Sequence, residues 1–257
     1  MHADVTFKLS TIYGFLLVLA RVSGVIAFVP IPGFSAGPEI SRVVLALALT
    51  VALVPVWPTP QVASFALGPM LGWMAAEAAF GLTIGVAVAF LLEGVQMAAQ
   101  LIGLPAGYSF ASTIDPSTQA DTTSLQLMAQ LMAGCLFLAL GFDRQVIHVL
   151  ARSLESIPAG TYSLAHSSVE AIARLGSGIF STGFQLAIPV LALMLLLDVA
   201  FAVLGRLQTQ LQLLSLSFSV KMLVALPFLA GILSSYPVIF KKAGEMTFTT
   251  LARLLNH

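Results

Sequence analysis

The sequence predicts an all-α integral membrane protein, and three observations support that fold class. Lys and Arg number 11 and Asp and Glu number 11, so charged residues make up 9% of the 257 residues, against about 25% in an ordinary soluble domain. Hydrophobic residues make up 58% and the mean hydropathy is +0.99. The apolar residues also gather in stretches of helix length. So few charges cannot cover a soluble surface, and a net charge of zero excludes a basic nucleic-acid binder.

Six apolar stretches are the expected helices, and they cover residues 9–29, 40–57, 70–92, 125–142, 178–204 and 222–240. A helix needs about 20 apolar residues to cross the hydrocarbon core of a bilayer. The second and fourth stretches are slightly shorter, so they are marginal spans. We expect one membrane-embedded unit over residues 1–257, with about six helices and no soluble domain.

Prolines and one polar segment refine this pattern. Pro189 and Pro227 lie inside apolar stretches and should kink them, whereas Pro237 lies near the end of the last one. In the segment 143–177, Leu150 and Leu154 recur at helical spacing, with Arg152 on the other face. This spacing predicts an amphipathic helix at the membrane interface.

Residues for catalysis are scarce. None of the four histidines stands at metal-ligand spacing from a second histidine or a carboxylate, and Cys135 is the single cysteine. No glycine loop that could hold a phosphate follows a strand, and there is no Gly-x-Ser-x-Gly turn. We therefore expect no enzyme activity, no cofactor and no metal site.

Six charged residues lie within or at the edges of the apolar stretches: Arg21, Glu77, Glu93, Asp198, Arg206 and Lys221. Each would cost ~2.5–3.5 kcal/mol or more at a lipid-facing midplane, so each should face protein or water. Two interpretations remain open for them. They can form ion pairs that fix helix packing, such as Arg21 with Glu77, or they can line a proton or ion pathway that takes part in gating. Packing is favoured because no two acids lie one helical turn apart.

Gly81 and Gly85 form a Gly-x-x-x-Gly motif in a series that recurs every four residues from Glu77 to Glu93. Glycines at this spacing let a second helix backbone approach closely. The motif predicts a helix–helix contact at these two glycines, in a helix packed between protein neighbours.

Two segments are unusual for their positions. Residues 103–116 join two apolar helices and mix glycines and small residues with Tyr108, Phe110 and Ile114. Irregular backbone at membrane depth requires protein or water to satisfy it. Residues 207–219 interleave Gln and Ser with Leu and Phe, and their spacing fits a helix and a strand equally well.

Together with two further patches, these segments resemble the FliR family of flagellar biosynthetic proteins and its counterparts in injectisome type III secretion. The first patch begins at Arg21 and leads to Pro30, Pro38 and Arg42. The second is Tyr108-Ser109-Phe110-Ala111-Ser112, followed by Asp115-Pro116. The third covers residues 137–160. The fourth contains Asp198, Gly205-Arg206, Gln210 and Lys221. One departure is that a Pro-Gln-Met-Asn-like run of the family reads Thr209-Gln210-Leu211-Gln212 here.

The resemblance implies a subunit of the export gate that assembles with FliP-type, FliQ-type and FlhB-type subunits in the bacterial inner membrane, at the flagellar basal body. In that family the helices form hairpins in a hetero-oligomeric assembly around a pore, through which unfolded proteins are exported. The partners implied are these subunits, the exported proteins and membrane lipid, with no nucleic acid.

The family places the plug that closes the pore in the central loop. A plug needs bulky apolar groups that exclude water, and small residues that allow movement. The candidate pore-closing residues are Gly107, Tyr108, Phe110, Ile114, Asp115 and Pro116.

The alternative is a small-solute secondary transporter or channel, because such proteins use Pro-broken helices and intramembrane carboxylates. Transporters usually contain paired repeats, and this sequence contains none.

Overall fold

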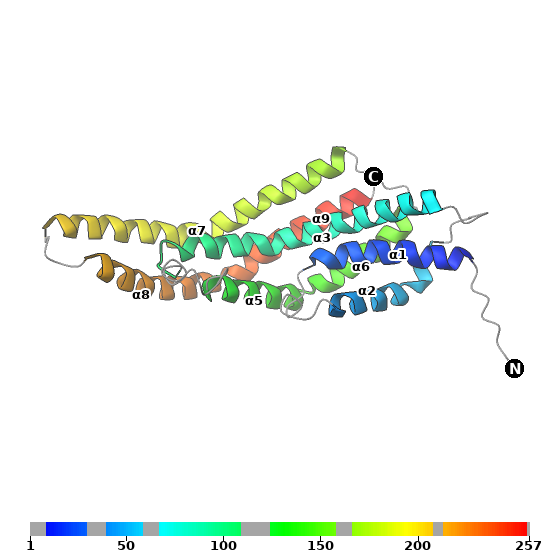
Figure 1. Cartoon of the computed structure of the whole chain (residues 1–257). Helices are drawn as coiled ribbons and strands as arrows, with labels where there is room; N and C mark the ends of the chain where they lie inside the picture. Colours follow the sequence, from blue (N-terminus) through cyan, green and yellow to red (C-terminus); the bar gives the residue numbers. More distant parts are fainter. Residues whose placement is uncertain are drawn as a thin grey trace. The chain divides into compact units, whose positions relative to one another are not determined.

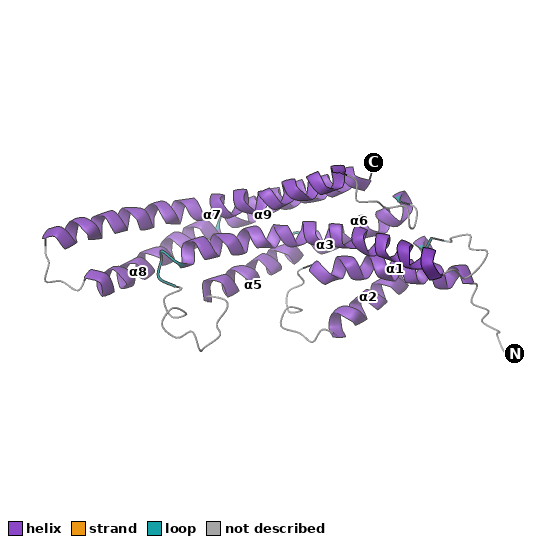
Figure 2. Ribbon diagram, turned by 45° about the horizontal axis from the view of Figure 1, so that its top comes forward, coloured by secondary structure: helices purple, strands orange, loops and turns teal. Residues whose placement is uncertain are grey.

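The computed structural model describes residues 9–29, 40–58, 67–108, 124–157, 166–207 and 213–255, and every regular element within them is helical (Figure 2). The predicted all-α fold class is confirmed. In chain order the elements (Figure 1) are α1 (Leu9–Phe28), α2 (Ile40–Ala52), the short 3-10 helix η1 (Val54–Val56), α3 (Leu67–Gly103), α5 (Ser124–Ala139), α6 (Phe142–Ser156), α7 (His166–Leu207), α8 (Leu213–Leu233) and α9 (Tyr236–Leu255).

Among the described residues, four helices are long and apolar enough to cross a membrane: α1, α3, α7 and α8. The number rises to five if α5 and α6 are counted as one broken span. The second apolar stretch, expected to be a marginal span, forms α2 and is not among them, because its 13 residues extend only about 20 Å at 1.5 Å per residue.

Several predicted helix boundaries are wrong, and two helices are longer than expected. The third apolar stretch was expected to end at residue 92, but α3 continues to Gly103. Glu93, Gln96 and Gln100 lower the hydropathy there, yet Glu and Gln are strong helix formers, so the helix continues. Similarly, α7 begins at His166, twelve residues before the expected start at 178. Its first three turns are helical, but they are polar and therefore lie outside the apolar stretch.

The prediction of one helix over residues 222–240 is also wrong. The chain turns at Ser234 and Ser235 between α8 and α9, and the Ser235 amide donates a hydrogen bond to the Ile232 carbonyl at 2.9 Å. Pro237 is the second residue of α9, where a missing amide hydrogen has no cost because the first turn has no internal acceptor. Pro189 lies inside α7 and Pro227 inside α8.

The fourth stretch, expected to run to residue 142, ends earlier, because α5 stops at Ala139. Gly141 then adopts a φ of +71° at the start of α6, a conformation that glycine adopts at no steric cost. The amphipathic helix predicted downstream is confirmed as α6, with Leu150 and Leu154 buried and Arg152 exposed.

The segment 207–219, which fitted a helix and a strand equally well, is helical from Leu213 onward. Its glutamines at 208, 210 and 212 lie outside the described residues.

The chain divides into two compact units. The first contains Met1–Ala89, Gly141–Leu175 and Glu245–His257, and the second contains Phe90–Leu140 and Gly176–Gly244. Each unit is therefore built from stretches that are distant in the sequence, and α3, α7 and α9 each contribute residues to both.

The core of the first unit is formed by apolar residues of α1, α3, α6 and α9. Fully buried examples are Leu17, Ile84 and Leu150. The rings of Phe142 in α6 and Phe248 in α9 pack with centroids 5.4 Å apart. This core brings the first and last helices of the chain together around the amphipathic α6.

The core of the second unit contains many alanines. Ala98, Ala133 and Ala187 are buried in α3, α5 and α7. Small side chains allow these helices to lie close together.

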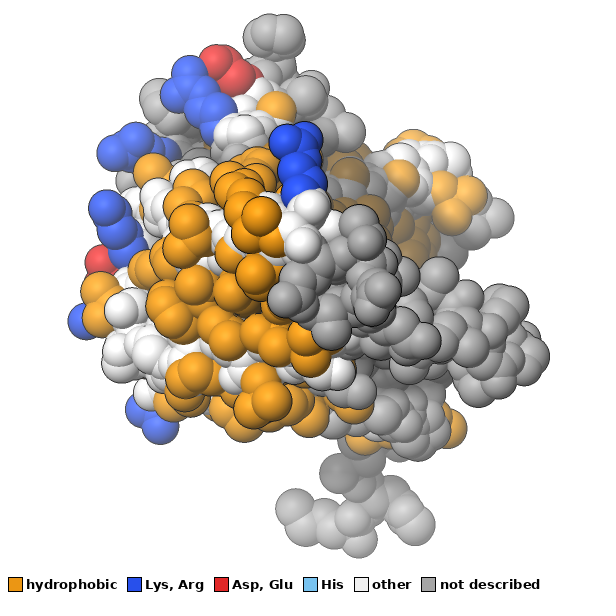
Figure 3. All heavy atoms as spheres, turned by 90° about the vertical axis from the view of Figure 1, so that its left-hand side faces the viewer, with side chains coloured by type: hydrophobic (Ala, Val, Ile, Leu, Met, Phe, Trp, Pro, Cys, Tyr) orange, Lys and Arg blue, Asp and Glu red, His pale blue; other side chains and the backbone are white. Residues whose placement is uncertain are grey.

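The second unit leaves much of α7 and α8 uncovered. Only 22% of the most apolar window of α7 and 11% of that of α8 are buried, against 56% for α1. Figure 3 views the end formed by the last turns of α7 and the first turns of α8, where hydrophobic side chains gather on the surface. Exposed examples are Leu195, Leu196, Leu204, Leu216 and Leu223.

Candidate functional site

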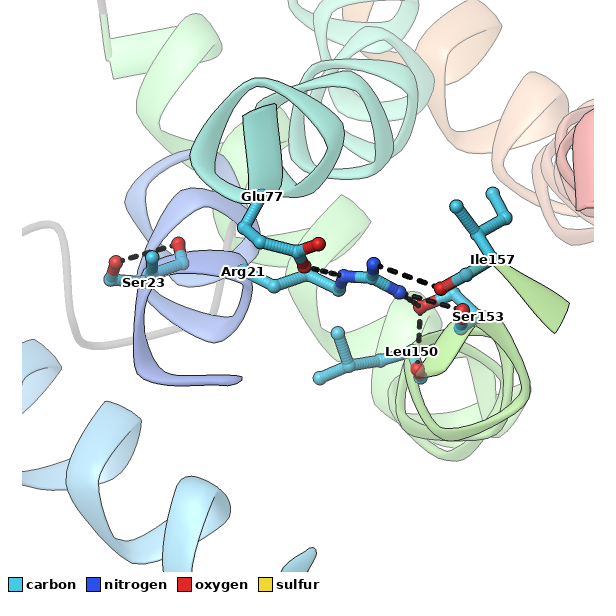
Figure 4. A network of polar contacts seen from close by, with 7 residues as sticks. Arg21, Ser23, Glu77, Leu150, Ser153 and Ile157 are labelled. Carbon is cyan, nitrogen blue, oxygen red and sulfur yellow. Dashed lines mark hydrogen bonds and ion pairs between the residues drawn. The ribbon is translucent and has the colours of Figure 1, made fainter. Parts of the chain in front are cut away.

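Arg21 of α1 is buried within the first unit. Its side chain and that of Glu77 are each only 1% exposed, and Arg21 Nε donates a hydrogen bond to Glu77 Oε2 at 2.5 Å (Figure 4). The Arg21 Cζ also lies 4.9 Å from the centroid of the Phe80 ring, a cation–π distance. Two of the predicted intramembrane charges thus form an ion pair that joins α1 to α3.

The rest of the Arg21 guanidinium is directed at the C-terminal end of α6 (Figure 4). Its Nη1 donates to the carbonyl oxygen of Ser153 at 2.6 Å and to the hydroxyl oxygen of Ser153 at 3.0 Å, and Nη2 donates to the carbonyl of Ile157 at 3.4 Å. The last carbonyls of a helix have no partner within it and carry a partial negative charge. Arg21 therefore caps α6 as well as pairing with Glu77.

Gly81 and Gly85 lie at the crossing of α1 and α3. A Cβ atom added at Gly85 would lie 2.7 Å from the carbonyl oxygen of Val25, and one at Gly81 would overlap the carbonyl oxygen of Arg21. Gly24, on the α1 side, faces the Ala78 carbonyl at a corresponding distance of 2.6 Å. The glycines allow the backbones to touch, and this close approach brings Glu77 within reach of Arg21.

The other four predicted charges belong to the second unit. Lys221 in α8 forms an ion pair with Asp198 in α7, and their side chains are 10% and 53% exposed. Arg206 is exposed in the last turn of α7, where a cation interacts favourably with the helix dipole. Glu93 is exposed on α3.

The base of the central loop is a capped turn at the end of α3. Gly107 has a φ of +85°, its amide donates to the Leu104 carbonyl at 3.2 Å, and the Tyr108 amide donates to the Gly103 carbonyl at 2.9 Å. This pair of bonds around a left-handed glycine is the Schellman motif that ends many helices. The turn is held in place from a second helix as well, because the Tyr108 hydroxyl donates to the Met222 carbonyl of α8 at 3.2 Å.

Gly107 also packs on α8, since a Cβ atom there would lie 3.3 Å from Phe218. Partial burial raises the pKa of the Tyr108 phenol above its usual value of about 10. The hydroxyl therefore remains a donor at physiological pH. The remaining candidate pore-closing residues, Phe110, Ile114, Asp115 and Pro116, lie outside the described residues.

An apolar cavity of about 410 Å³ lies beside this turn within the second unit. Tyr108 and residues of α3, α5, α7, α8 and α9 line it, including Ile102, Met132, Leu186 and Leu226. Its wall also contains Tyr236, whose buried hydroxyl has no hydrogen-bond partner among the described residues.

Nothing in the described part of the chain resembles a metal centre: no three His, Cys, Asp or Glu side chains lie close enough to hold an ion. The chemistry that the arrangement supports is structural, namely buried charge pairing, tight helix crossing and an anchored turn. Sequence reasoning missed the part of Ser153 and Ile157 in the arginine network. Two of the acceptors are backbone carbonyls, which leave no signal in residue type, and the third is the hydroxyl of a single serine.

Comparison with known proteins identifies the family. The family model for bacterial export proteins, family 1, matches residues 12–246. The chain belongs to this family. The resemblance seen in the sequence is confirmed, as is its extent, because the match leaves out only short segments at the two ends.

Relatives in three bacteria carry the same name. The flagellar biosynthetic protein FliR of Escherichia coli (strain K12) is 28% identical over 239 residues, which is 93% of this chain and 91% of the relative. FliR of Bacillus subtilis (strain 168) is 25% identical over 248 residues, or 94% of each chain. FliR of Pectobacterium carotovorum is 24% identical over 243 residues, or 94% of this chain and 92% of the relative.

Proposed function

We propose that the chain is a subunit of the flagellar type III protein export gate and helps to form and close the pore through which unfolded flagellar proteins leave the cell. The observation that carries this proposal is similarity to FliR proteins over more than nine tenths of the chain. The helices that are long and apolar enough to span a membrane fit an export subunit. We therefore expect the chain to have a structural rather than an enzymatic role in export.

The alternative of a small-solute transporter gains no support from the relatives, whose names all refer to flagellar biosynthesis. The charged residues also favour packing. Arg21 and Glu77 neutralise each other in a buried site, as expected for a pair that fixes helix packing.

The specific partners belong to the proposal: FliP-type and FliQ-type gate subunits and an FlhB-type subunit, in the bacterial inner membrane at the flagellar basal body. The little-buried faces of α7 and α8 leave apolar surface that lipid or a partner subunit must cover, which is compatible with an assembled state.

Pore closure is assigned to the central loop that begins at Gly107. The Schellman turn and the Tyr108 hydrogen bond fix where the loop leaves α3, so a deletion can begin one residue later without disturbing the helix. We expect deletion of residues 109–118 to leave the complex assembled but leaky to ions. The measurement is membrane conductance together with complex yield on a native gel, and an assembled, ion-tight variant would place the seal elsewhere.

The experiment that tests the function itself is copurification and complementation. The full chain, expressed with FliP-, FliQ- and FlhB-type subunits, should purify in a large hetero-oligomer, and expressed alone it should be degraded or aggregate in mild detergent. It should also restore swimming and hook-protein export to a normally flagellated bacterium from which its own FliR has been deleted. A stable, monodisperse monomer that restores neither would contradict the proposal.

A further inference from the structure

Glu93 is a charged residue for which the described part of the chain offers no partner. It lies in the second unit, inside the candidate span Gly68–Gly103 of α3, and it is exposed. Ion pairs elsewhere use Glu77, Glu170 and Asp198 as the acids. The carboxylate of Glu93 makes neither a hydrogen bond nor an ion pair with the described residues.

Among the described residues, no Lys or Arg is in contact with Glu93. Of the 11 Lys and Arg residues, all except Lys8 lie in the described ranges, and none of these contacts Glu93. Lys221, in the same unit, is already paired with Asp198. A cation for Glu93 must therefore come from another molecule or from the N-terminal segment.

The surroundings of Glu93 are apolar, which argues that this part of α3 does not simply stand in water. The next residue, Gly94, lies so close to α7 that an added Cβ atom would be 3.1 Å from Thr182 Cβ. On either side of Thr182, α7 exposes Phe180 and Phe184. One to two turns further along, Ala98, Ala99 and Ile102 of α3 line the apolar cavity together with residues of α8, itself a candidate span.

Two amides extend the polar surface along the same face of α3. Gln96 and Gln100 follow Glu93 at spacings of three and seven residues, and Gln100 is exposed while Gln96 is half-buried. Residues at these spacings share one helical face. A carboxylate and two amides in one row cannot be satisfied by hydrocarbon, so this face requires a polar partner.

We propose that Glu93 forms an intersubunit ion pair with a Lys or Arg on a transmembrane helix of a neighbouring gate subunit, and that Gln96 and Gln100 hydrogen-bond to the same helix. This inference rests on the proposed function, because it requires the hetero-oligomer. Charge complementarity selects the occupant. An apolar lipid tail would leave the carboxylate unsolvated, whereas a basic side chain both neutralises it and supplies hydrogen-bond donors.

The test uses the coexpressed complex and four variants: Glu93→Lys, Glu93→Gln, Glu93→Asp, and Glu155→Lys as the matched control. Glu155 is an exposed acid on α6, in the first unit, so its reversal applies the same chemical change away from the proposed contact. We expect Glu93→Lys to lower the yield of intact complex at least tenfold, Glu93→Gln to lower it severalfold, and Glu93→Asp and Glu155→Lys to leave it near wild type.

A second arm separates a lost contact from a misfolded chain. Intramembrane Lys and Arg residues of the partner subunits are changed to Glu one at a time in the Glu93→Lys background, and restored complex yield at one position identifies the partner residue. Wild-type yield for Glu93→Lys, or loss of complex that no such partner change restores, would overturn the inference. Absence of a complex with the unaltered chain would instead contradict the proposed function.

Discussion

The α1–α3 crossing of the first unit and the α7–α8 pair of the second each contain an ion pair between apolar helices, but they differ in how much protein surrounds it. The Arg21 and Glu77 side chains are each 1% exposed, whereas Asp198 is 53% exposed beside Lys221. The most apolar window of α1 is 56% buried and that of α8 only 11%. The first pair is completed by this chain alone. In the second unit, the described residues leave most of the apolar surface of α7 and α8 uncovered.

The largest effect is expected when the buried pair is broken. Arg21→Leu should destabilise the first unit by about 3–5 kcal/mol, because the buried charge of Glu77 loses the ion pair with Arg21. The measurement is thermal unfolding of the purified complex, followed by protease resistance. Arg174→Leu is the control: its pair with Glu170 is 77% and 56% exposed, so its effect should stay below about 1 kcal/mol. Equal stability of the two variants would refute a structural role for the buried pair.

The second prediction concerns Gly81 and Gly85, where α1 and α3 cross. Gly72 of the same helix is a control whose change in stability should have the opposite sign. Gly81→Ala should destabilise by about 1–3 kcal/mol, because its Cβ overlaps the α1 backbone, and Gly85→Leu should block assembly altogether. Gly72→Ala has no atom within 4 Å of its Cβ and should stabilise the same helix by up to about 1 kcal/mol. Thermal unfolding and complex yield measure both, and a stabilised Gly81→Ala variant would show that the crossing is loose.

A smaller effect is expected at the half-exposed pair. Asp198→Asn should change the stability of the chain by only about 1 kcal/mol, because solvent or a neighbouring group already screens its carboxylate. If a partner subunit covers this face, the same variant should lower complex yield more than it lowers thermal stability. A loss of stability as large as that of Arg21→Leu would remove the contrast between the two units.

The smallest effect is expected at the base of the central loop. Tyr108→Phe removes the hydrogen bond to the Met222 carbonyl and should cost about 0.5–1.5 kcal/mol. The raised pKa of the phenol keeps it protonated, so the cost should be the same at neutral and mildly alkaline pH. Tyr236→Phe is the control, because its buried hydroxyl has no partner among the described residues, and it should be neutral or stabilising. A pH-dependent cost at Tyr108 would contradict this assignment.

The sequence was sufficient for the fold class because hydropathy reports directly on burial in lipid or protein. It predicted the ends of helices poorly, since hydropathy falls at Glu93 while helix propensity does not. The break at Ser234 and Ser235 was missed for the converse reason: both flanking helices are apolar there, and the local signal was Pro237 in a position that favours the start of a new helix.

The candidate site was predictable only in part. Charge complementarity named Arg21 with Glu77 as an example of a pair, and the glycine spacing indicated a close crossing, but the neighbour that crosses Gly81 could not be identified without the fold. The C-terminal carbonyls of α6 that Arg21 caps were not predictable, because any residue could have supplied them.

The arginine network also imposes an order on biosynthesis. Glu77 lies 56 residues after Arg21 in the chain, and Ser153 lies 132 residues after Arg21. At about 5–20 residues per second, Glu77 leaves the ribosome roughly 3–11 s after Arg21 and Ser153 roughly 7–26 s after it. The arginine of the first helix is therefore neutralised early, but its remaining donors wait for a helix made much later. During that interval the membrane insertion machinery must keep a charge-balanced but incompletely hydrogen-bonded arginine away from lipid, and synthesis of α6 ends this requirement.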